Sequence, residues 1–199
     1  MAAVIKEKSL GFRYSGERYR DVEKKVEAAS RHEAFVLFEN AKKRLNDINN
    51  WQLLCGKTPA EFQLTDKLGN FINASTPETG NLIKVRCYTK GTDKFIWYRI
   101  EEFIGEKNLL KDTEDFGFHV VRVSDPSQQA YDFSGITCTF LVTRSGCHVS
   151  AVEAERSKIL VNESMPVLIK LKDKMQHIFS WISSSNQQWK SLINGVLQY

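Results

Sequence analysis

The sequence predicts an α+β protein in which a curved antiparallel sheet of about seven strands surrounds a long C-terminal helix. Three observations in the 199-residue chain predict this fold. A strand-like segment near residue 21 leads directly into an amphipathic helix, apolar and polar residues then alternate between residues 61 and 156, and helical spacing returns after residue 164. Consecutive strands without intervening helices pair antiparallel, because parallel pairing requires a long crossover.

The first predicted helix begins at a capping box. Ser30 is followed by Glu33 three residues later. Its hydroxyl and the Glu33 carboxylate can each accept a hydrogen bond from a backbone N–H that has no partner within the helix. Before it, residues 21–28 alternate like a half-exposed strand, and residues 1–19 are expected to form an irregular arm or an added edge strand. Trp51, Leu53 and Leu54 follow the helix and are expected to anchor the turn. The predicted apolar stripe consists of Ala34, Phe35, Phe38, Ala41, Leu45 and Ile48.

The middle of the chain predicts six further strands. Their residues alternate with a period of two, which is typical of strands with one buried face. Ser145 and Gly146 indicate a tight hairpin between the last two strands. The predicted strands are residues 61–66, 82–89, 94–107, 115–124, 136–143 and 148–156.

The C-terminal segment predicts a long amphipathic helix. Ser164 is a suitable cap, Pro166 suits the first turn, and residues 183–186 are expected to bend or break the helix. Its stripe consists of Leu168, Leu171, Met175, Ile178 and Ile182, followed beyond the bend by Trp189, Leu192, Ile193, Val196 and Leu197.

Composition excludes several classes of protein. The apolar fraction of 42% and net charge of +4 fit one globular domain over residues 1–199. Without an apolar run of about 18 residues or a secretory signal, we expect no transmembrane segment and a cytoplasmic location. The spacing of the 4 Cys predicts neither a metal site nor a cofactor. The basic excess lies in the first 44 residues and is typical of a solvated helix end, so no nucleic-acid partner is expected.

The order of elements resembles the START-like or helix-grip superfamily (SRPBCC), which includes lipid-transfer domains, birch-pollen-allergen-like proteins and polyketide cyclases. The resemblance covers residues 20–197 and is one of pattern. It is carried by the strand VEKKVEA leading into SRHEAFVLFENAKKRL, by the helix end NDINNW, and by the closing amphipathic helix. It implies a cavity between the sheet and the C-terminal helix that binds a small hydrophobic molecule such as a lipid, a sterol or a polyketide.

A cavity enclosed by a curved sheet and one helix is expected to have mainly apolar walls. Met175 is the residue best able to adapt its shape to a ligand. The predicted ligand-binding residues are Ile83, Val85, Trp97, Tyr98, Phe118, Phe140, Leu171 and Met175.

The sequence does not show which face of the predicted strand 94–107 points into the cavity. Phe95, Trp97, Arg99 and Glu101 share one face, which points either into the cavity or outward with its charges solvated. The inward alternative makes Arg99 and Glu101 candidates for catalysis.

His119 is a further candidate for acid–base chemistry. Since no nucleophile or nucleotide-binding motif is present, we expect a binding protein rather than an enzyme. The alternatives are a cyclase or dehydratase using Arg99, Glu101 or His119, and a chaperone-regulator-like interaction module whose exposed Trp181 and Trp189 contact a protein or form a homodimer.

Overall fold

A single seven-stranded antiparallel sheet dominates the computed structural model, in the order β1-β7-β6-β5-β4-β3-β2. The structure describes residues 12–58, 61–74, 76–89, 92–128, 135–162 and 187–198. The edge strands of the sheet are β1 and β2. From β2 to β7 each strand pairs with the next one in the chain, and β1 pairs with β7. The strands are β1 (Phe12–Glu27), β2 (Glu61–Thr65), β3 (Leu82–Thr89), β4 (Thr92–Asn108), β5 (Thr113–Val123), β6 (Ile136–Ser145) and β7 (His148–Asn162).

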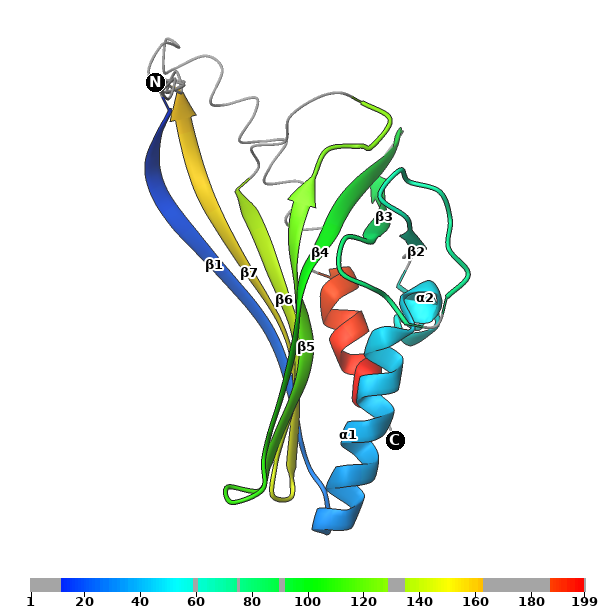
Figure 1. The fold of residues 1–199 in the computed structure, drawn as a ribbon, viewed down its shortest axis with the longest axis vertical. Coiled ribbons are helices and arrows are strands. Elements are labelled where there is room, and N and C mark those ends of the chain that lie inside the picture. The colour runs from blue at the N-terminus through cyan, green and yellow to red at the C-terminus, as the bar shows by residue number, and fades with distance from the viewer. Residues whose placement is uncertain are drawn as a thin grey trace, which may run out of the picture.

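The described helices all lie on one side of this curved sheet (Figure 1). They are α1 (Arg31–Asn46), the short η1 (Ile48–Asn50) and α2 (Trp51–Leu54), and a C-terminal helix over residues 187–196, which we call the terminal helix. The face of the sheet toward these helices is called the inner face below. No helix among the described residues is long and apolar enough to cross a membrane.

The capping box forms at the start of α1. The Glu33 N–H donates to Ser30 Oγ at 3.1 Å, and Glu33 Oε2 accepts from the Ala29 N–H at 3.1 Å. Phe35 is 41% exposed, so its predicted place in the buried stripe is wrong, and Leu37 is buried instead. The reason is the phase of the helix, because residues three and four apart share a face and Leu37, with Ala34, Ala41 and Phe38, lies on it.

An aromatic cluster fills the space between the helices and the inner face. Trp51 is fully buried, stacks against Phe118 with ring centroids 6.4 Å apart, and donates from Nε1 to the carbonyls of Arg44 and Leu45. Trp189 of the terminal helix packs against Phe140 with centroids 5.3 Å apart. Trp51 therefore anchors the turn after α1, as predicted, and also joins that turn to the sheet. The prediction is wrong for Leu53, which is exposed.

Two cations hold the C-terminal end of the terminal helix. Lys24 of β1 donates to the carbonyl of Asn194 at 3.0 Å, and Arg44 of α1 donates to the carbonyls of Val196 and Gln198. The last carbonyls of a helix have no partner within it and carry partial negative charge, so cations there are stabilising. The terminal helix is thus gripped between β1 and α1.

The terminal helix also packs closely on α2. A Cβ atom built on Gly195 would lie 2.2 Å from the Leu54 carbonyl oxygen. Nearby, Cys55 Sγ lies 3.8 Å from the carbonyl oxygen of Gln188, and burial raises the pKa of this thiol to about 11. The last helix therefore contacts α2 without room for a methyl group.

The predicted fold class, an α+β helix-grip arrangement, is confirmed. Five of the predicted strands, β2 to β6, match the observed ones to within two residues. Both β1 and β7 are longer than predicted, and residues 12–19 belong to the edge strand β1. The predicted helical stripe at residues 164–182 and the bend after it lie outside the described residues.

We expect Gly195→Ala to lower the free energy of unfolding by about 1–2 kcal/mol. Overpacking against α2 costs about 1–3 kcal/mol, and the higher helix propensity of alanine recovers at most about 1 kcal/mol. Urea unfolding measures the change. Gly105→Ala is the matched control, because a Cβ on Gly105 meets nothing within 4 Å. Equal stability of Gly195→Ala and wild type would contradict the close packing on α2.

Candidate functional site

Four polar side chains meet on the inner face of β1, β6 and β7. They are Arg20, Cys138, Glu153 and Glu155, and we call them the inner-wall cluster. Arg20 and Cys138 are each the direct cross-strand partner of Glu155, and Glu153 lies opposite Phe140 of the aromatic cluster. Because side chains on one face of a strand are two residues apart, this register places all four on the inner face. The charges therefore directly adjoin the apolar core.

Arg20 binds both carboxylates through one nitrogen. Its Nη2 donates to Glu153 Oε1 at 3.0 Å and to Glu155 Oε2 at 2.9 Å. Its Nε and Nη1 atoms are buried and have no hydrogen-bond partner among the residues that the structure describes. A guanidinium has five N–H donors, so most of the donors of Arg20 are not used by the two glutamates.

Burial shifts the titration of this cluster. The Glu153 side chain is fully buried, and desolvation raises its pKa from 4.5 to about 7, against the opposing effect of the Arg20 charge. Desolvation also raises the pKa of the Cys138 thiol well above its usual value. Cys138 is therefore a neutral thiol at physiological pH, and Glu153 is the group that changes charge near neutrality.

Tyr98 connects the cluster to the aromatic core. It is buried on β4 and packs edge-on against Trp189, with ring centroids 6.1 Å apart. Desolvation raises the pKa of its phenol well above 10, and the charges of Glu153, Glu155 and Arg122 also act on it. A neutral hydroxyl therefore lies close to the charged groups of the inner wall.

The cluster carries potential metal ligands but does not suit a metal ion. One ligand atom each from Cys138, Glu153 and Glu155 lies within 4.8 Å of the others, the one such group among the described residues. The Arg20 guanidinium lies at hydrogen-bond distance from both carboxylates and would repel a cation at this place. The arrangement suits hydrogen bonding to a polar group of an otherwise apolar molecule.

Sequence reasoning missed these four residues. Charged positions on alternating strands are normally assigned to the exposed face, and Glu153 and Glu155 follow Val149 and Ala151 at a spacing of two on the buried face. That continuation of an apolar face by acidic residues was the available signal.

The predicted ligand-binding residues fall into three groups. Five of them belong to one buried core on the inner face, namely Ile83, Val85, Tyr98, Phe118 and Phe140. Their role as ligand contacts stays a prediction. Leu171 and Met175 lie outside the described residues.

Trp97 occupies the opposite face of the sheet from Tyr98. It is 6% exposed because the loops around Gly69 and Pro126 cover it, and Lys84 Nζ lies 5.1 Å from its ring centroid. Since side chains alternate along a strand, Trp97 and Tyr98 cannot both face the core. The face of β4 that carries Trp97 and Arg99 therefore points outward.

The three candidate catalytic residues do not gather on the inner face. Arg99 Nε lies 2.6 Å from Glu101 Oε1 in an exposed ion pair, and His119 Nδ1 contacts Thr139 Oγ1 at 2.7 Å, also exposed. A β-bulge between Ile100 and Glu102 interrupts the alternation, which places Phe103 on the core side against Phe118. Their arrangement gives no support to the cyclase alternative through these residues.

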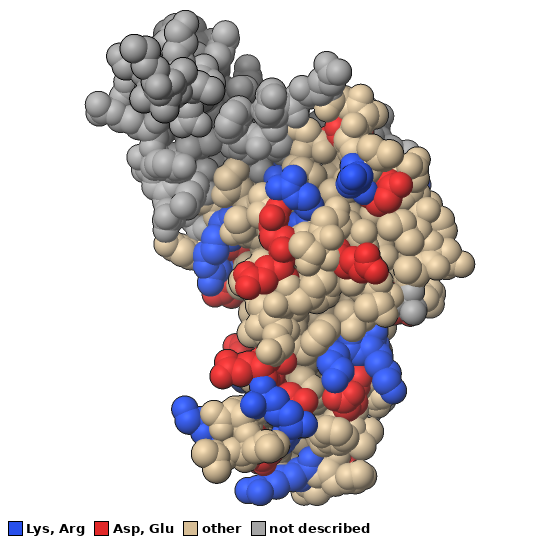
Figure 2. All heavy atoms as spheres, viewed as in Figure 1, with Lys and Arg blue, Asp and Glu red and all other residues tan. Residues whose placement is uncertain are grey.

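Trp189 is 2% exposed, so the expectation that it forms an exposed contact surface is wrong. Its ring is covered because it contributes to the aromatic cluster. Trp181 lies outside the described residues. On the face shown in Figure 2, acidic and basic side chains are intermixed.

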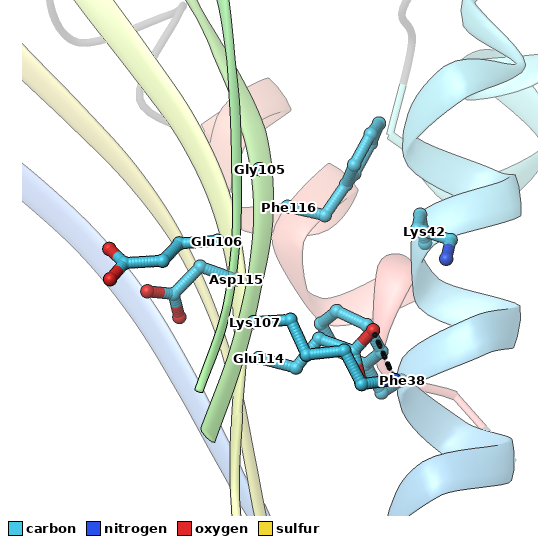
Figure 3. Close-up of a pocket in the computed structure, with 8 residues that line it drawn as sticks. All are labelled: Phe38, Lys42, Gly105, Glu106, Lys107, Glu114, Asp115 and Phe116. Carbon is cyan, nitrogen blue, oxygen red and sulfur yellow. Dashed lines mark hydrogen bonds and ion pairs between the residues drawn. The ribbon is translucent and has the colours of Figure 1, made fainter. Parts of the chain in front are cut away.

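A hollow opens at the side of the molecule, between α1 and the ends of β4 and β5 (Figure 3). It has a volume of about 230 Å³, and Phe38 and Phe116 form its apolar part. Figure 3 shows Glu106 and Asp115 pointing away from α1, whereas Lys107 and Glu114 lie on the side toward it. Of its charged lining residues, Lys107 pairs with Glu114 and Lys42 pairs with Glu39.

That side hollow is a shallow groove next to the core. Gly105 contributes no side chain on the inner face opposite Phe116, which leaves the space open. Because its cations Lys42 and Lys107 already have acidic partners and it lies at the surface, this groove is a weaker candidate for a ligand site than the inner-wall cluster.

Comparison with known proteins concerns the fold. No family model matches the sequence, and no curated protein matches it. Solved structures match along most of the chain, among them members of the helix-grip superfamily that the sequence resembles.

Three of these structures illustrate the similarity. A hypothetical protein from Helicobacter pylori is 11% identical, with 88% of this chain and 86% of that chain covered and a TM-score of 0.49. Norcoclaurine synthase from Thalictrum flavum is 8% identical, with 94% of this chain and 99% of that chain covered and a TM-score of 0.41. Major latex-like protein 151 from Panax ginseng is 11% identical, with 88% of this chain and 97% of that chain covered and a TM-score of 0.38. Similarity at this level carries no argument about function.

We expect the Glu153→Gln variant to lose one component of the pH dependence of stability. Because burial raises the pKa of Glu153 from 4.5 to about 7, the folded state retains a proton that the unfolded state releases between these values. This contribution is fully present below pH 4.5 and is lost as the pH rises through 7.

The loss amounts to roughly 3 kcal/mol, at about 1.36 kcal/mol per pKa unit. Urea unfolding between pH 4.5 and pH 7 measures this loss. The free energy of unfolding of wild type minus that of the variant should fall as the pH rises. A difference that stays constant with pH would show that Glu153 titrates alike in the folded and unfolded states.

Proposed function

We propose that the protein binds a small, largely apolar molecule on the inner face of its sheet, with the inner-wall cluster contacting the polar group of that molecule. The observation that carries the proposal is the full burial of Glu153 beside an aromatic core, with the half-buried Arg20 and Glu155 in contact with it or with each other. Buried ionic groups seldom add stability compared with apolar side chains of the same volume. A cluster of this kind, with a strongly perturbed pKa, is therefore a candidate for function.

The surroundings of the cluster suit such a ligand. The rings of Tyr98, Phe140 and Trp189 lie on its core side and offer apolar area worth roughly 25 cal/mol per Å² buried. Apolar walls with a few convergent polar groups are typical of small-molecule sites. Carriage of a lipid-like or polyketide-like compound, which the sequence resemblance implies, fits this chemistry, and no metal or organic cofactor is required for it. The expected cytoplasmic location is compatible with such a role.

The proposal predicts that a bulky residue on the inner face blocks binding. Val22 pairs with Glu153 across β1 and β7 and packs against the core. We expect Val22→Phe to weaken binding of the fluorescent probe anilinonaphthalene sulfonate by about tenfold or more, because the ring occupies the space beside the cluster. Native mass spectrometry of the purified protein independently detects any ligand retained from the cell.

Glu23→Phe is the matched control. Glu23 is the next residue of β1 and is exposed on the other face, so this variant should bind the probe like wild type. Near-UV circular dichroism shows whether each variant retains its tertiary packing. Probe binding that is equal in both variants, together with no retained ligand, would contradict a binding site on the inner face.

A further inference from the structure

We propose that the ligand is an apolar carboxylic acid, that its carboxylate is bound by the unused N–H groups of Arg20, and that Glu153 takes up a proton when it binds. This inference rests on the proposed function and specifies the chemistry of the same site. It derives from the geometry of Arg20 and from the number of charges that face it.

The first step is the division of the Arg20 donors. Both glutamates are bound by Nη2 alone, whereas Nε and Nη1 are buried without an acceptor in the described part of the chain. Buried donors without partners are costly, and charge-assisted hydrogen bonds to a guanidinium are the strongest available replacement. A carboxylate oxygen at Nε or at Nη1 forms a charge-assisted hydrogen bond, which is stronger than the bond that a neutral hydroxyl forms there.

The second step is the charge balance on the inner face. The titratable and charged groups that face Glu153 are Arg20 from β1, Cys138 from β6 and Glu155 from β7, with Tyr98 from β4 and Arg122 from β5 beside them. Cys138 and Tyr98 stay neutral at physiological pH, because burial raises the pKa of both groups. Two cations therefore face two carboxylates.

An amine ligand would place a third cation beside Arg20 and leave its donors unused. A carboxylate ligand would instead add a third negative charge next to Glu153 and Glu155, and like charges at short distance raise the affinity for a proton. The pKa of Glu153 is already raised to about 7, so this residue accepts the proton most readily. Atoms balance in this step, since one proton from solvent neutralises Glu153 as one carboxylate enters.

The size of the proton uptake follows from the titration of Glu153. With a pKa of about 7 in the free protein, the residue is half protonated at pH 7 and becomes almost fully protonated in the complex. We therefore expect uptake of about half a proton per ligand at pH 7, and close to none near pH 6, where Glu153 already carries its proton and the ligand is still a carboxylate.

Isothermal titration calorimetry with matched acids and alcohols tests the inference. The probes are decanoate against decan-1-ol, and 1-naphthylacetate against 2-(1-naphthyl)ethanol, so that two apolar bodies are compared. We expect each acid to bind about tenfold or more tightly than its alcohol. Titrations in phosphate and in Tris, which differ in ionisation enthalpy, measure the proton uptake.

Three variants locate the effect. Glu153→Gln should bind the acids with the proton uptake abolished, and Arg20→Gln should lose the preference for acid over alcohol. Arg156→Gln is the matched control, because Arg156 pairs with Asp21 on the outer face of the same two strands and should behave like wild type. If Arg20→Gln fails to fold, wild type and Glu153→Gln alone decide the question.

The outcomes separate the inference from the function on which it rests. Acids and alcohols that bind equally well, or acids that bind without proton uptake, would overturn the carboxylate inference and leave a binding protein. If none of the four probes binds, both the carboxylate inference and the proposed site are wrong. Acid preference with uptake that disappears in Glu153→Gln supports both.

Discussion

The need to cover one apolar face of a large open sheet determines most of this structure. Seven strands present a continuous inner face, while the described helices are short. Where α1, α2 and the terminal helix contact the sheet, that face carries aromatic and aliphatic side chains. Farther along β1, β6 and β7 it carries Arg20, Glu153 and Glu155. The change from apolar to charged residues on a single face divides the inner surface into a core and a candidate site.

The two parts are energetically different. The aromatic cluster around Trp51 and Trp189 supplies apolar burial and specific ring contacts, both of which stabilise the fold. The inner-wall cluster gives no comparable benefit, because desolvation of Glu153 outweighs the attraction of Arg20 and raises its pKa. A fold that tolerates such a group close to its core is more readily explained by selection for binding than by selection for stability.

Elements of the fold could be predicted from the sequence because each has a local signal. The capping box at Ser30, the hairpin at Gly146 and the alternation of β3 all depend on neighbouring residues, and all are observed. The site could not be predicted in the same way. Trp97 and Tyr98 lie on opposite faces of β4, and alternation alone does not show which of the two faces points inward.

Two further features of the site depend on tertiary contacts. The bulge beside Glu101 shifts the phase of β4, and no residue pattern marked it. Arg20 and Glu153 are 133 positions apart in the chain and meet only because β1 pairs with β7. The sequence therefore showed which segments alternate, whereas the pairing of the first strand with the last determined which charges are buried together.

The position of Cys55 has a practical consequence. Its sulfur lies against the first turn of the terminal helix, and its high pKa keeps it in the unreactive thiol form. An alkylating reagent reaches this sulfur only after the last helix has separated from α2. The modification rate of Cys55 thus measures how often the terminal helix separates from α2, without a cysteine having to be introduced.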